Sequence, residues 1–183
     1  MSRIPTPATI EAAPSASQPL LQAVKKQLGM APNLFRLVAN SPAALEGYLS
    51  LSGALAKGEL PAPTRERIAL AVAEINGCDY CLSAHTYLGK IVAKLDDAEI
   101  AANRSGASND IKADAAVRFA AKVATLRGHV TNEDFAALKS AGYTDAQIIE
   151  IVQHVALNTW TNYINTVGQT DIDFPMVAAR KAA

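Results

Sequence analysis

The stretch that decides the fold is residues 63–85, PTRERIALAVAEINGCDYCLSAH. Its first half is rich in alanine and aliphatic residues, opens with a proline and stops at Asn76-Gly77. Proline in the first turn and glycine just past the last turn are typical of a helix. A second helix is expected to start around Cys78 and to run to about Leu95. The stretch therefore predicts two antiparallel helices joined by a tight turn.

The same helix signals recur outward along the chain. Ser17 is an N-cap candidate for a helix that ends at Gly29, and Thr131 pairs with Asp134 in the pattern of a capping box. No run shows convincing period-two alternation, so the predicted class is all-α. Apart from the two helices above, segments with helical character span 17–29, 32–42, 42–58, 96–104, 109–128, 131–142 and 144–170.

Composition excludes several classes of protein. Half of the 183 residues are hydrophobic and only 5% are aromatic, which suits close-packed helices in a single domain. Lys+Arg and Asp+Glu are equal at 17 each, which argues against a nucleic-acid partner. No apolar run is long enough to span a membrane, and no continuous apolar region resembles a secretory signal. We therefore expect a cytoplasmic protein with no membrane association.

Two regions are expected along the chain. Residues 1–17 are rich in Pro, Ala, Ser and Thr and are predicted to form an extended arm with little structure of its own. The arm is either a disordered tail or a segment that packs on a neighbouring subunit. Residues 18–183 are predicted to form one all-α domain.

The only cysteines, Cys78 and Cys81, share a helix face with His85. At ~100° per residue the three side chains fall within an arc of ~60°. A helix N-terminus lowers the pKa of a thiol, and the spacing allows one thiol to attack an oxidant and the other to resolve the product. His85 lies four residues after Cys81, within reach to take its proton.

Zinc binding and inert packing are the alternatives to redox chemistry. The pattern C-x2-C-x3-H offers three ligands, whereas structural zinc takes four, and the chain has no second CxxC. His129 or His154 could supply the fourth ligand. His154 lies among apolar residues in a helix, however, and is interpreted as a hydrogen-bonded core histidine. We favour redox chemistry, with no metal and no cofactor.

Distance from the turn, measured along the helix axis, distinguishes two candidate carboxylates on the preceding helix. At ~1.5 Å per residue, Glu66 lies ~15 Å from the turn and His85 lies ~12 Å from it on the other helix. Glu74 lies nearer the turn, at the height of the cysteines. Glu66 is therefore the better candidate to orient His85 or relay its proton, although it could also be a surface carboxylate in a first helical turn.

Glu66, Cys78, Cys81 and His85 together resemble the E-x11-C-x-x-C-x3-H signature of alkylhydroperoxidase D-like (AhpD-like) proteins. These proteins belong to the carboxymuconolactone decarboxylase superfamily. The stretches APNLFRLVANSPAALEGYL and ALNTWTNYINTVGQTDIDFP resemble its peroxidase-related branch, so the similarity extends over nearly the whole chain beyond the arm.

The resemblance implies an all-α fold, a homo-oligomer (commonly a trimer or hexamer) and thiol-dependent reduction of hydroperoxides in antioxidant defence. Carried over to this chain, Cys81 attacks the peroxide, Cys78 resolves the product, His85 is the base and Glu66 belongs to the proton relay. An external dithiol or a thioredoxin- or lipoyl-type reductant would restore the pair. Two further functions remain open, a dithiol–disulfide exchanger or redox sensor without significant peroxidase turnover, and a zinc-binding structural module.

Position 80 departs from the family pattern. The best-described members carry a histidine there, and this chain carries Tyr80. A phenol titrates near ~10 and cannot shuttle protons at neutral pH, but it can donate a hydrogen bond to water or a carboxylate.

A polar face is also expected on the last helix. Asn158, Asn162 and Asn165 recur at spacings of four and three and therefore lie on one side. They either bond helix ends or a subunit interface, or line the substrate pocket with the sole tryptophan, Trp160.

Overall fold

The structure, a computed structural model, describes residues 2–180. Within that range the chain forms nine α-helices, one short 3-10 helix and no β-strand, so the predicted all-α class is confirmed. In chain order these are the 3-10 helix η1 (Ser15–Ser17) and the helices α1 (Gln18–Leu28), α2 (Asn33–Val38), α3 (Pro42–Leu55), α4 (Ala62–Ile75), α5 (Asp79–Ile91), α6 (Asp97–Arg104), α7 (Ile111–Thr125), α8 (Asn132–Ser140) and α9 (Asp145–Gly168). None of these helices is both long enough and apolar enough to cross a bilayer.

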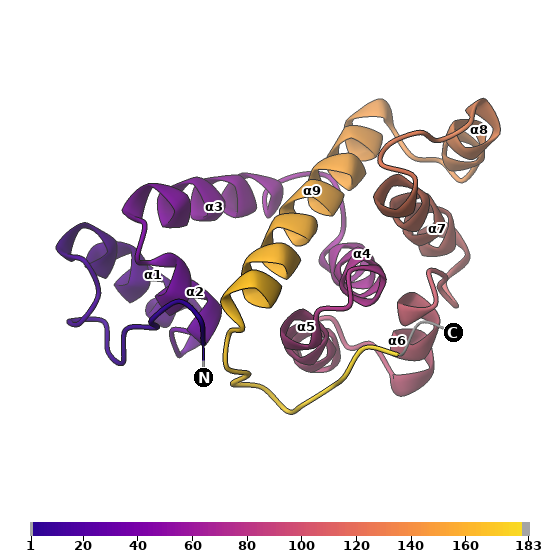
Figure 1. Ribbon diagram of the computed structural model, residues 1–183. Helices are drawn as coiled ribbons and strands as arrows, with labels where there is room; N and C mark the ends of the chain where they lie inside the picture. Colours follow the sequence, from indigo (N-terminus) through magenta and orange to yellow (C-terminus); the bar gives the residue numbers. More distant parts are fainter. Residues whose placement is uncertain (1, 181–183) are drawn as a thin grey trace.

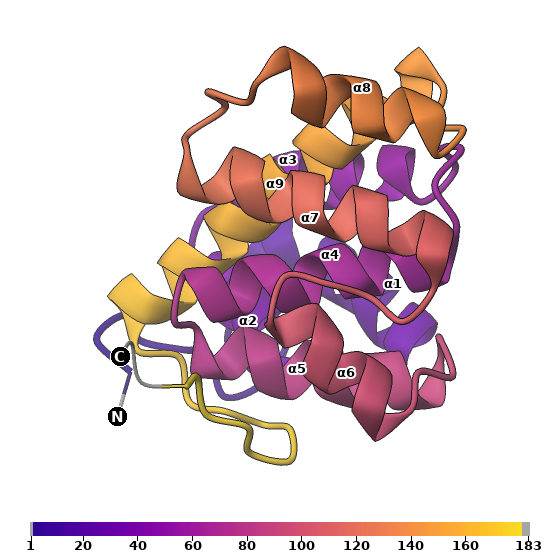
Figure 2. The same ribbon diagram turned by 90° about the vertical axis from the view of Figure 1, so that its right-hand side faces the viewer.

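Helix α4 occupies the middle of the molecule. It packs against α5, α6, α7 and α9, and Figure 2 shows it between α5 and α7. Its six residues from Ile68 to Ala73 are all buried, as expected for a helix that is apolar on every side. The long helix α9 crosses the molecule diagonally, with α1 to α3 on one side and α4 to α8 on the other (Figure 1).

Two apolar clusters meet at α4. One contains Leu70 with the cysteines and the buried leucines of α1 to α3 and α5. The other contains Ile68 and Val72 with apolar side chains of α7, α8 and α9. The orientation of α4 is therefore fixed from both sides, and this orientation aims the side chain of Glu66 toward α5.

Two helix ends differ from the sequence prediction. Helix α5 ends at Ile91 rather than near Leu95, because the chain turns at Lys94 (φ +56°) and buries Leu95 against Gly89. Ser17 precedes α1 as predicted, but its hydroxyl does not cap the helix. It donates instead to the carbonyl of Ala39, at 2.7 Å.

The N-terminal arm contacts its own chain. The N–H of Arg3 donates to the carbonyl of Gly168, and the side chain of Asn40 donates to the carbonyl of Pro5. Residues 2–14 therefore contain no helix but are tied to α2 and to the end of α9. Met1 of the predicted arm and residues 181–183 of the predicted domain lie outside the described residues.

Residues 169–180, here called the C-terminal strap, run without regular structure across α5 (Figure 1). The N–H of Val177 donates to the hydroxyl of Ser83 at 2.9 Å, and the N–H of Ala179 donates to Asp79 at 2.7 Å. Both acceptors lie in the first turns of α5. The strap therefore covers the helix that carries the cysteines.

A buried carboxylate ties α4 to α6 and to the loop before α7. Glu99 of α6 is 6% exposed and accepts from Arg67 of α4, from Asn103, from Ser108 and from the N–H of Asn109. Burial alone would raise the pKa of Glu99, but these hydrogen bonds lower it to about 2.

We expect Glu99→Gln to lower the free energy of unfolding by about 3 kcal/mol, because it removes one charge of a buried pair. The pKa of Glu99 is depressed in the folded state, so its contribution is present above the unfolded value and is lost as pH falls from about 4.5 to about 2. Urea unfolding at pH 7 and pH 3 measures both effects. A variant as stable as the wild type at pH 7 would contradict this account.

Candidate active site

The turn between α4 and α5 places both cysteines at the start of α5. Gly77 has φ +64° and reverses the chain, and Cys78 is then the N-cap of α5. The Sγ of Cys78 accepts from the N–H of Cys81 at 3.3 Å and donates to the Sγ of Cys81 at 2.8 Å. Both are free thiols, only 2% and 3% exposed. The predicted placement at a helix N-terminus is confirmed, and the two sulfur atoms are in contact.

Glu66 and His85 meet across the antiparallel pair. The Oε2 of Glu66 lies 2.8 Å from the Nδ1 of His85, so the match in height predicted from the sequence is confirmed. Glu74 does not join this group. Its carboxylate accepts from Arg104 of α6 and from the N–H of Arg180 in the strap.

The surroundings move the pKa values of the thiols in opposite directions. The hydrogen bond from Cys78 lowers the pKa of the Cys81 thiol, against the effect of burial, and the amide of Asn165 lowers it further. The pKa of Cys78 is raised, because its thiol holds the proton that it donates to Cys81 and is itself buried. Of the two thiols, Cys81 is therefore the one that ionises first.

His85 is biased toward its charged form. Burial disfavours the imidazolium, but the charge and the hydrogen bond of Glu66 raise the pKa of His85 above its usual value. Within residues 2–180 neither thiol is hydrogen-bonded to His85, although Cys81 lies one turn before it on α5. The lowered pKa of Cys81 and the raised pKa of His85 both favour transfer of a proton from thiol to imidazole.

A cavity of about 340 Å³ adjoins this group. Glu66, His85, Tyr48 and Tyr80 supply polar atoms to its wall, and most of the remaining lining is apolar, including Leu28, Met30, Leu34, Phe35, Leu88 and Phe174. The volume and the few convergent polar groups are typical of a small-molecule site. Neither cysteine lines the cavity and both are buried, but Tyr80 in its wall is the chain neighbour of Cys81.

Tyr80 points to the strap rather than to the thiols. Its hydroxyl donates to Oδ1 of Asp173 at 2.9 Å and accepts from the N–H of Leu34 at 3.1 Å. The sequence-based prediction that it can donate to a carboxylate is confirmed. Burial raises the pKa of Tyr80, so the phenol stays neutral and holds α5, α2 and the strap together.

We expect Tyr80→Phe to destabilise the fold by about 1–2 kcal/mol, because two buried hydrogen bonds are lost. The peroxide turnover that the family resemblance implies should change by less than about threefold, since a phenol that stays protonated and donates to Asp173 relays no proton at neutral pH. Denaturant unfolding and initial rates measure the two quantities. A large loss of rate in a well-folded variant would place the hydroxyl in the proton relay.

The three asparagines of α9 do not line the cavity. Asn162 accepts from the side chain of Asn76, which caps the C-terminus of α4, at 2.8 Å. Asn165 donates to the Sγ of Cys81 at 3.3 Å, and Asn158 donates to the carbonyl of His154. Bonding to a helix end is thus correct for Asn162, and none of the three asparagines lines this cavity.

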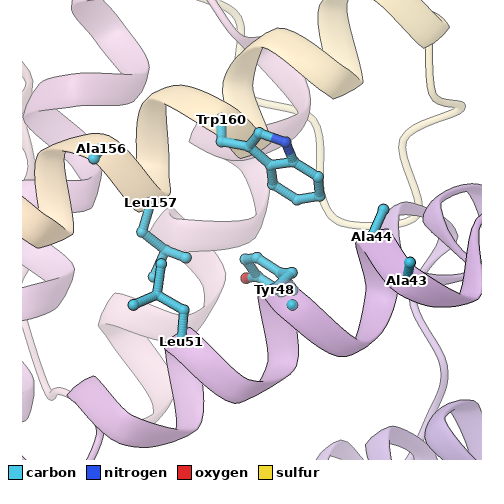
Figure 3. A pocket seen from close by; sticks show the side chains of 8 residues that line it. Ala43, Ala44, Tyr48, Leu51, Ala156, Leu157 and Trp160 are labelled. Atoms are coloured by element: carbon cyan, nitrogen blue, oxygen red, sulfur yellow. The ribbon is translucent and has the colours of Figure 1, made fainter.

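Trp160 lies at a separate apolar cleft between α3 and α9. Figure 3 shows its ring facing Tyr48 across this cleft, and the ring centroids are 5.3 Å apart. The asparagines do not line this cleft, because they lie on the other side of α9, so the alternative that groups them with Trp160 in one pocket has no support here. Tyr48 lines both the cleft and the cavity beside Glu66. Burial, Cys81 and Glu66 raise the pKa of Tyr48 to about 12.

His154 is a core residue, but it is not hydrogen-bonded as expected. Its Nε2 is buried without a partner among the described residues. Burial and the nearby charge of Arg65 lower the pKa of His154 to about 4, so it is neutral at pH 7. Within residues 2–180 no three His, Cys, Asp or Glu side chains are arranged to hold a metal ion.

Three residues at the site have no strong signal of their own in the sequence. Tyr48, Asp173 and Phe174 all lie inside the two outer stretches of family resemblance, but no spacing rule links them to the cysteines. Asp173 and Phe174 follow the last helix and reach the site only through the path of the strap.

Residues 42–126, which include the thiols and the Glu66–His85 pair, match the model of the carboxymuconolactone decarboxylase family. The structure is similar to an uncharacterized peroxidase-related protein with an alkylhydroperoxidase AhpD core from Ralstonia eutropha JMP134. The TM-score is 0.83 at 28% identity, over 94% of this chain and 92% of that one. In fold and in residues 42–126, this chain is similar to AhpD-like members of the carboxymuconolactone decarboxylase superfamily.

Other solved structures share the AhpD-like fold. A peroxidase-related protein from Silicibacter sp. TM1040 is similar at 25% identity with a TM-score of 0.78, over 91% of each chain. The debrominase Bmp8 aligns with a TM-score of 0.76 at 22% identity, over 92% of this chain and 91% of that one. No curated protein sequence matches this chain. The peroxidase-related structures support a peroxidase role at the level of the family, and the debrominase shows that the fold also carries other activities.

Proposed function

We propose that this AhpD-like protein is a thiol-dependent peroxidase that reduces hydroperoxides in antioxidant defence. The observation that carries the proposal is the meeting of a low-pKa thiol at Cys81, a contacting second thiol and a Glu66–His85 pair beside one cavity. A nucleophile, a resolving group and a proton carrier are the groups that such a reaction requires.

The proposed reaction has two chemical steps before reduction. The thiolate of Cys81 attacks the terminal oxygen of ROOH, the O–O bond breaks, and the alkoxide leaves with a proton from His85 as ROH. Cys81 is then a sulfenic acid. The thiol of Cys78 attacks this sulfur and forms the Cys78–Cys81 disulfide with release of water. An external dithiol, of the thioredoxin or lipoyl type, reduces the disulfide and is itself oxidised.

The lining of the cavity supports an organic hydroperoxide as substrate. Leucine, methionine and aromatic side chains cover most of the wall, and Glu66 and His85 stand at its polar part. An alkyl or aryl group can bury its surface there while the peroxide group approaches the thiols. We expect a larger alkyl hydroperoxide to have a lower KM than hydrogen peroxide.

A dithiol–disulfide exchanger is the second candidate function. It is favoured by the contact of the two thiols at 2.8 Å, because a pair that can close a disulfide can exchange with another dithiol without any peroxide. Such a protein exchanges rapidly with dithiols, whereas its peroxide turnover hardly exceeds that of a free thiol.

The test is consumption of cumene hydroperoxide and of hydrogen peroxide by the reduced protein, with lipoamide, thioredoxin and dithiothreitol as separate donors. Multiple turnovers with one donor support the peroxidase. Rapid dithiol exchange without peroxide turnover supports the exchanger. Stoichiometric zinc in protein purified without chelator would instead support a structural metal module.

We further propose that the protein assembles as a homo-oligomer. Helix α9 carries five large apolar side chains that are exposed and recur at helical spacing, so they lie on one face. They are Ile149, Val152, Trp160, Tyr163 and Val167. A contiguous apolar face of this kind is what a subunit interface covers. We expect light scattering to give the mass of a trimer or hexamer, and a monomer at all concentrations would contradict the proposal.

A further inference from the structure

The two thiols have different hydrogen-bond partners, and the N-terminus of α5 alone does not explain why Cys81 has the lower pKa. Among residues 2–180 the one backbone N–H that bonds a thiol is that of Cys81, and it points to the Sγ of Cys78 at 3.3 Å. A hydrogen bond to sulfur favours the thiolate, so the end of α5 favours ionisation of Cys78. The hydrogen bond that the Cys78 thiol donates to Cys81 opposes this preference most strongly, and groups outside α5 add to its effect.

Helix α9 provides such groups directly behind Cys81. Asn165 is 3% exposed, and its Nδ2 donates to the Sγ of Cys81 at 3.3 Å. Asn162 is 1% exposed, and its Oδ1 accepts from the side chain of Asn76 at 2.8 Å. That bond fixes the orientation of the amide and leaves the Nδ2 of Asn162 for another acceptor.

The Nδ2 of Asn162 is buried and has no hydrogen-bond partner among residues 2–180. Buried amide donors are nearly always bonded, because leaving one unpaired costs free energy. The negative charge of a thiolate offsets that cost through space, and the side chains of Asn165, Asn162 and Thr161 each lower the pKa of Cys81.

We propose that Asn165 and Asn162 form an amide cradle that holds Cys81 as the thiolate and so makes it, rather than Cys78, the attacking cysteine. Only one part of this inference rests on the proposed function, namely that Cys81 is the cysteine that attacks the peroxide. The cradle itself is a property of the reduced protein. Both asparagines are positioning residues, since Asn165 donates to the nucleophile from α9 and Asn162 lies one turn before Asn165 on the same face, whereas the cavity lies beside Tyr80 and His85 on α5.

The amides of the cradle do not titrate, which makes their effect separable from that of other groups. The titratable groups around Cys81 come from α3, α4, α5 and the strap; they are Tyr48, Glu66, Cys78, Tyr80, His85 and Asp173. Removing an amide leaves all six in place. A change in the pKa of Cys81 then reports the lost hydrogen bond.

The test measures the pKa of Cys81 from the pH dependence of its alkylation by iodoacetamide. It uses Cys78→Ser protein, in which Cys81 is the sole thiol, with and without Asn165→Leu. We expect Asn165→Leu to raise the pKa of Cys81 by about one unit or more, and therefore to slow alkylation at pH 6 by about tenfold. At a pH above both pKa values the two proteins should react at similar rates.

Asn158→Leu is the matched control. It removes another buried amide from the same face of α9, but that amide bonds the carbonyl of His154 and not a thiol. The pKa of Cys81 should stay as in the parent. If Asn165→Leu does not fold, as judged by circular dichroism, Asn165→Ala serves in its place and the same rise is expected.

An unchanged pKa of Cys81 in the folded Asn165 variant, or an equal rise with Asn158→Leu, overturns the cradle. Alkylation needs no peroxide, so the result is independent of peroxidase activity. A raised pKa in a protein without peroxide turnover supports the cradle and counts only against the proposed function.

Discussion

Cys81→Ser should abolish peroxide turnover, with a loss of more than about 1,000-fold in kcat/KM, because a serine hydroxyl does not ionise or attack peroxide at neutral pH. Cys78→Ser should also stop multiple turnover, but for another reason. Its Cys81 still attacks one equivalent of peroxide, and the sulfenic acid then persists because the resolving thiol is absent.

Mass spectrometry separates the two variants, which differ only in which sulfur is removed. After one equivalent of cumene hydroperoxide, Cys78→Ser should carry a dimedone-reactive sulfenic acid at Cys81, and the wild type should carry a Cys78–Cys81 disulfide. Cys81→Ser should carry neither. A sulfenic acid trapped at Cys78 in the Cys81→Ser variant would show that Cys78, and not Cys81, attacks the peroxide.

His85→Gln should lower kcat/KM by about 100-fold to 10,000-fold, the usual range for a lost proton-transfer group. The proposed mechanism uses the protonated imidazole to complete the leaving alcohol, so the rate should fall at alkaline pH as His85 loses its proton. His129→Gln is the matched control, because His129 is exposed and remote from the thiols in sequence. Its rate should equal that of the wild type.

Glu66→Gln should move the alkaline limb of this pH profile to lower pH. The carboxylate of Glu66 raises the pKa of His85 against the effect of burial, so its removal lets burial lower that pKa. The pH range in which the enzyme is active then becomes narrower, because its upper limit falls. A profile that is unchanged in Glu66→Gln would exclude His85 as the group that titrates there.

Local signals in the sequence sufficed for the helices, because caps, glycine stops and apolar periodicity act within a few residues. They also sufficed for the pairing of Glu66 with His85, since two antiparallel helices joined by a tight turn have a calculable match in height. The residue at which α5 ends could not be predicted from these local signals. Leu95 continues the helical pattern, but the chain turns at Lys94 and buries Leu95 against Gly89.

The roles of Asn165 and Asp173 could not be obtained in this way. Asn165 reaches Cys81 across 84 positions of the sequence, and Asp173 reaches Tyr80 across 93. Such contacts depend on how α9 crosses α5 and on where the chain goes after α9. Spacing on the last helix predicted a shared face for the asparagines, but it held no information on what that face contacts.

The path of the strap has a consequence for how the protein folds. Asp173 and Phe174 complete the wall beside Tyr80, yet they belong to a segment that follows the last helix. The wall beside Tyr80 therefore closes only after α9 has formed and the chain that follows it has folded back over α5. An intermediate without this segment in place lacks the hydrogen bond from the Tyr80 phenol to Asp173, so docking of the strap is expected to be a late step of folding.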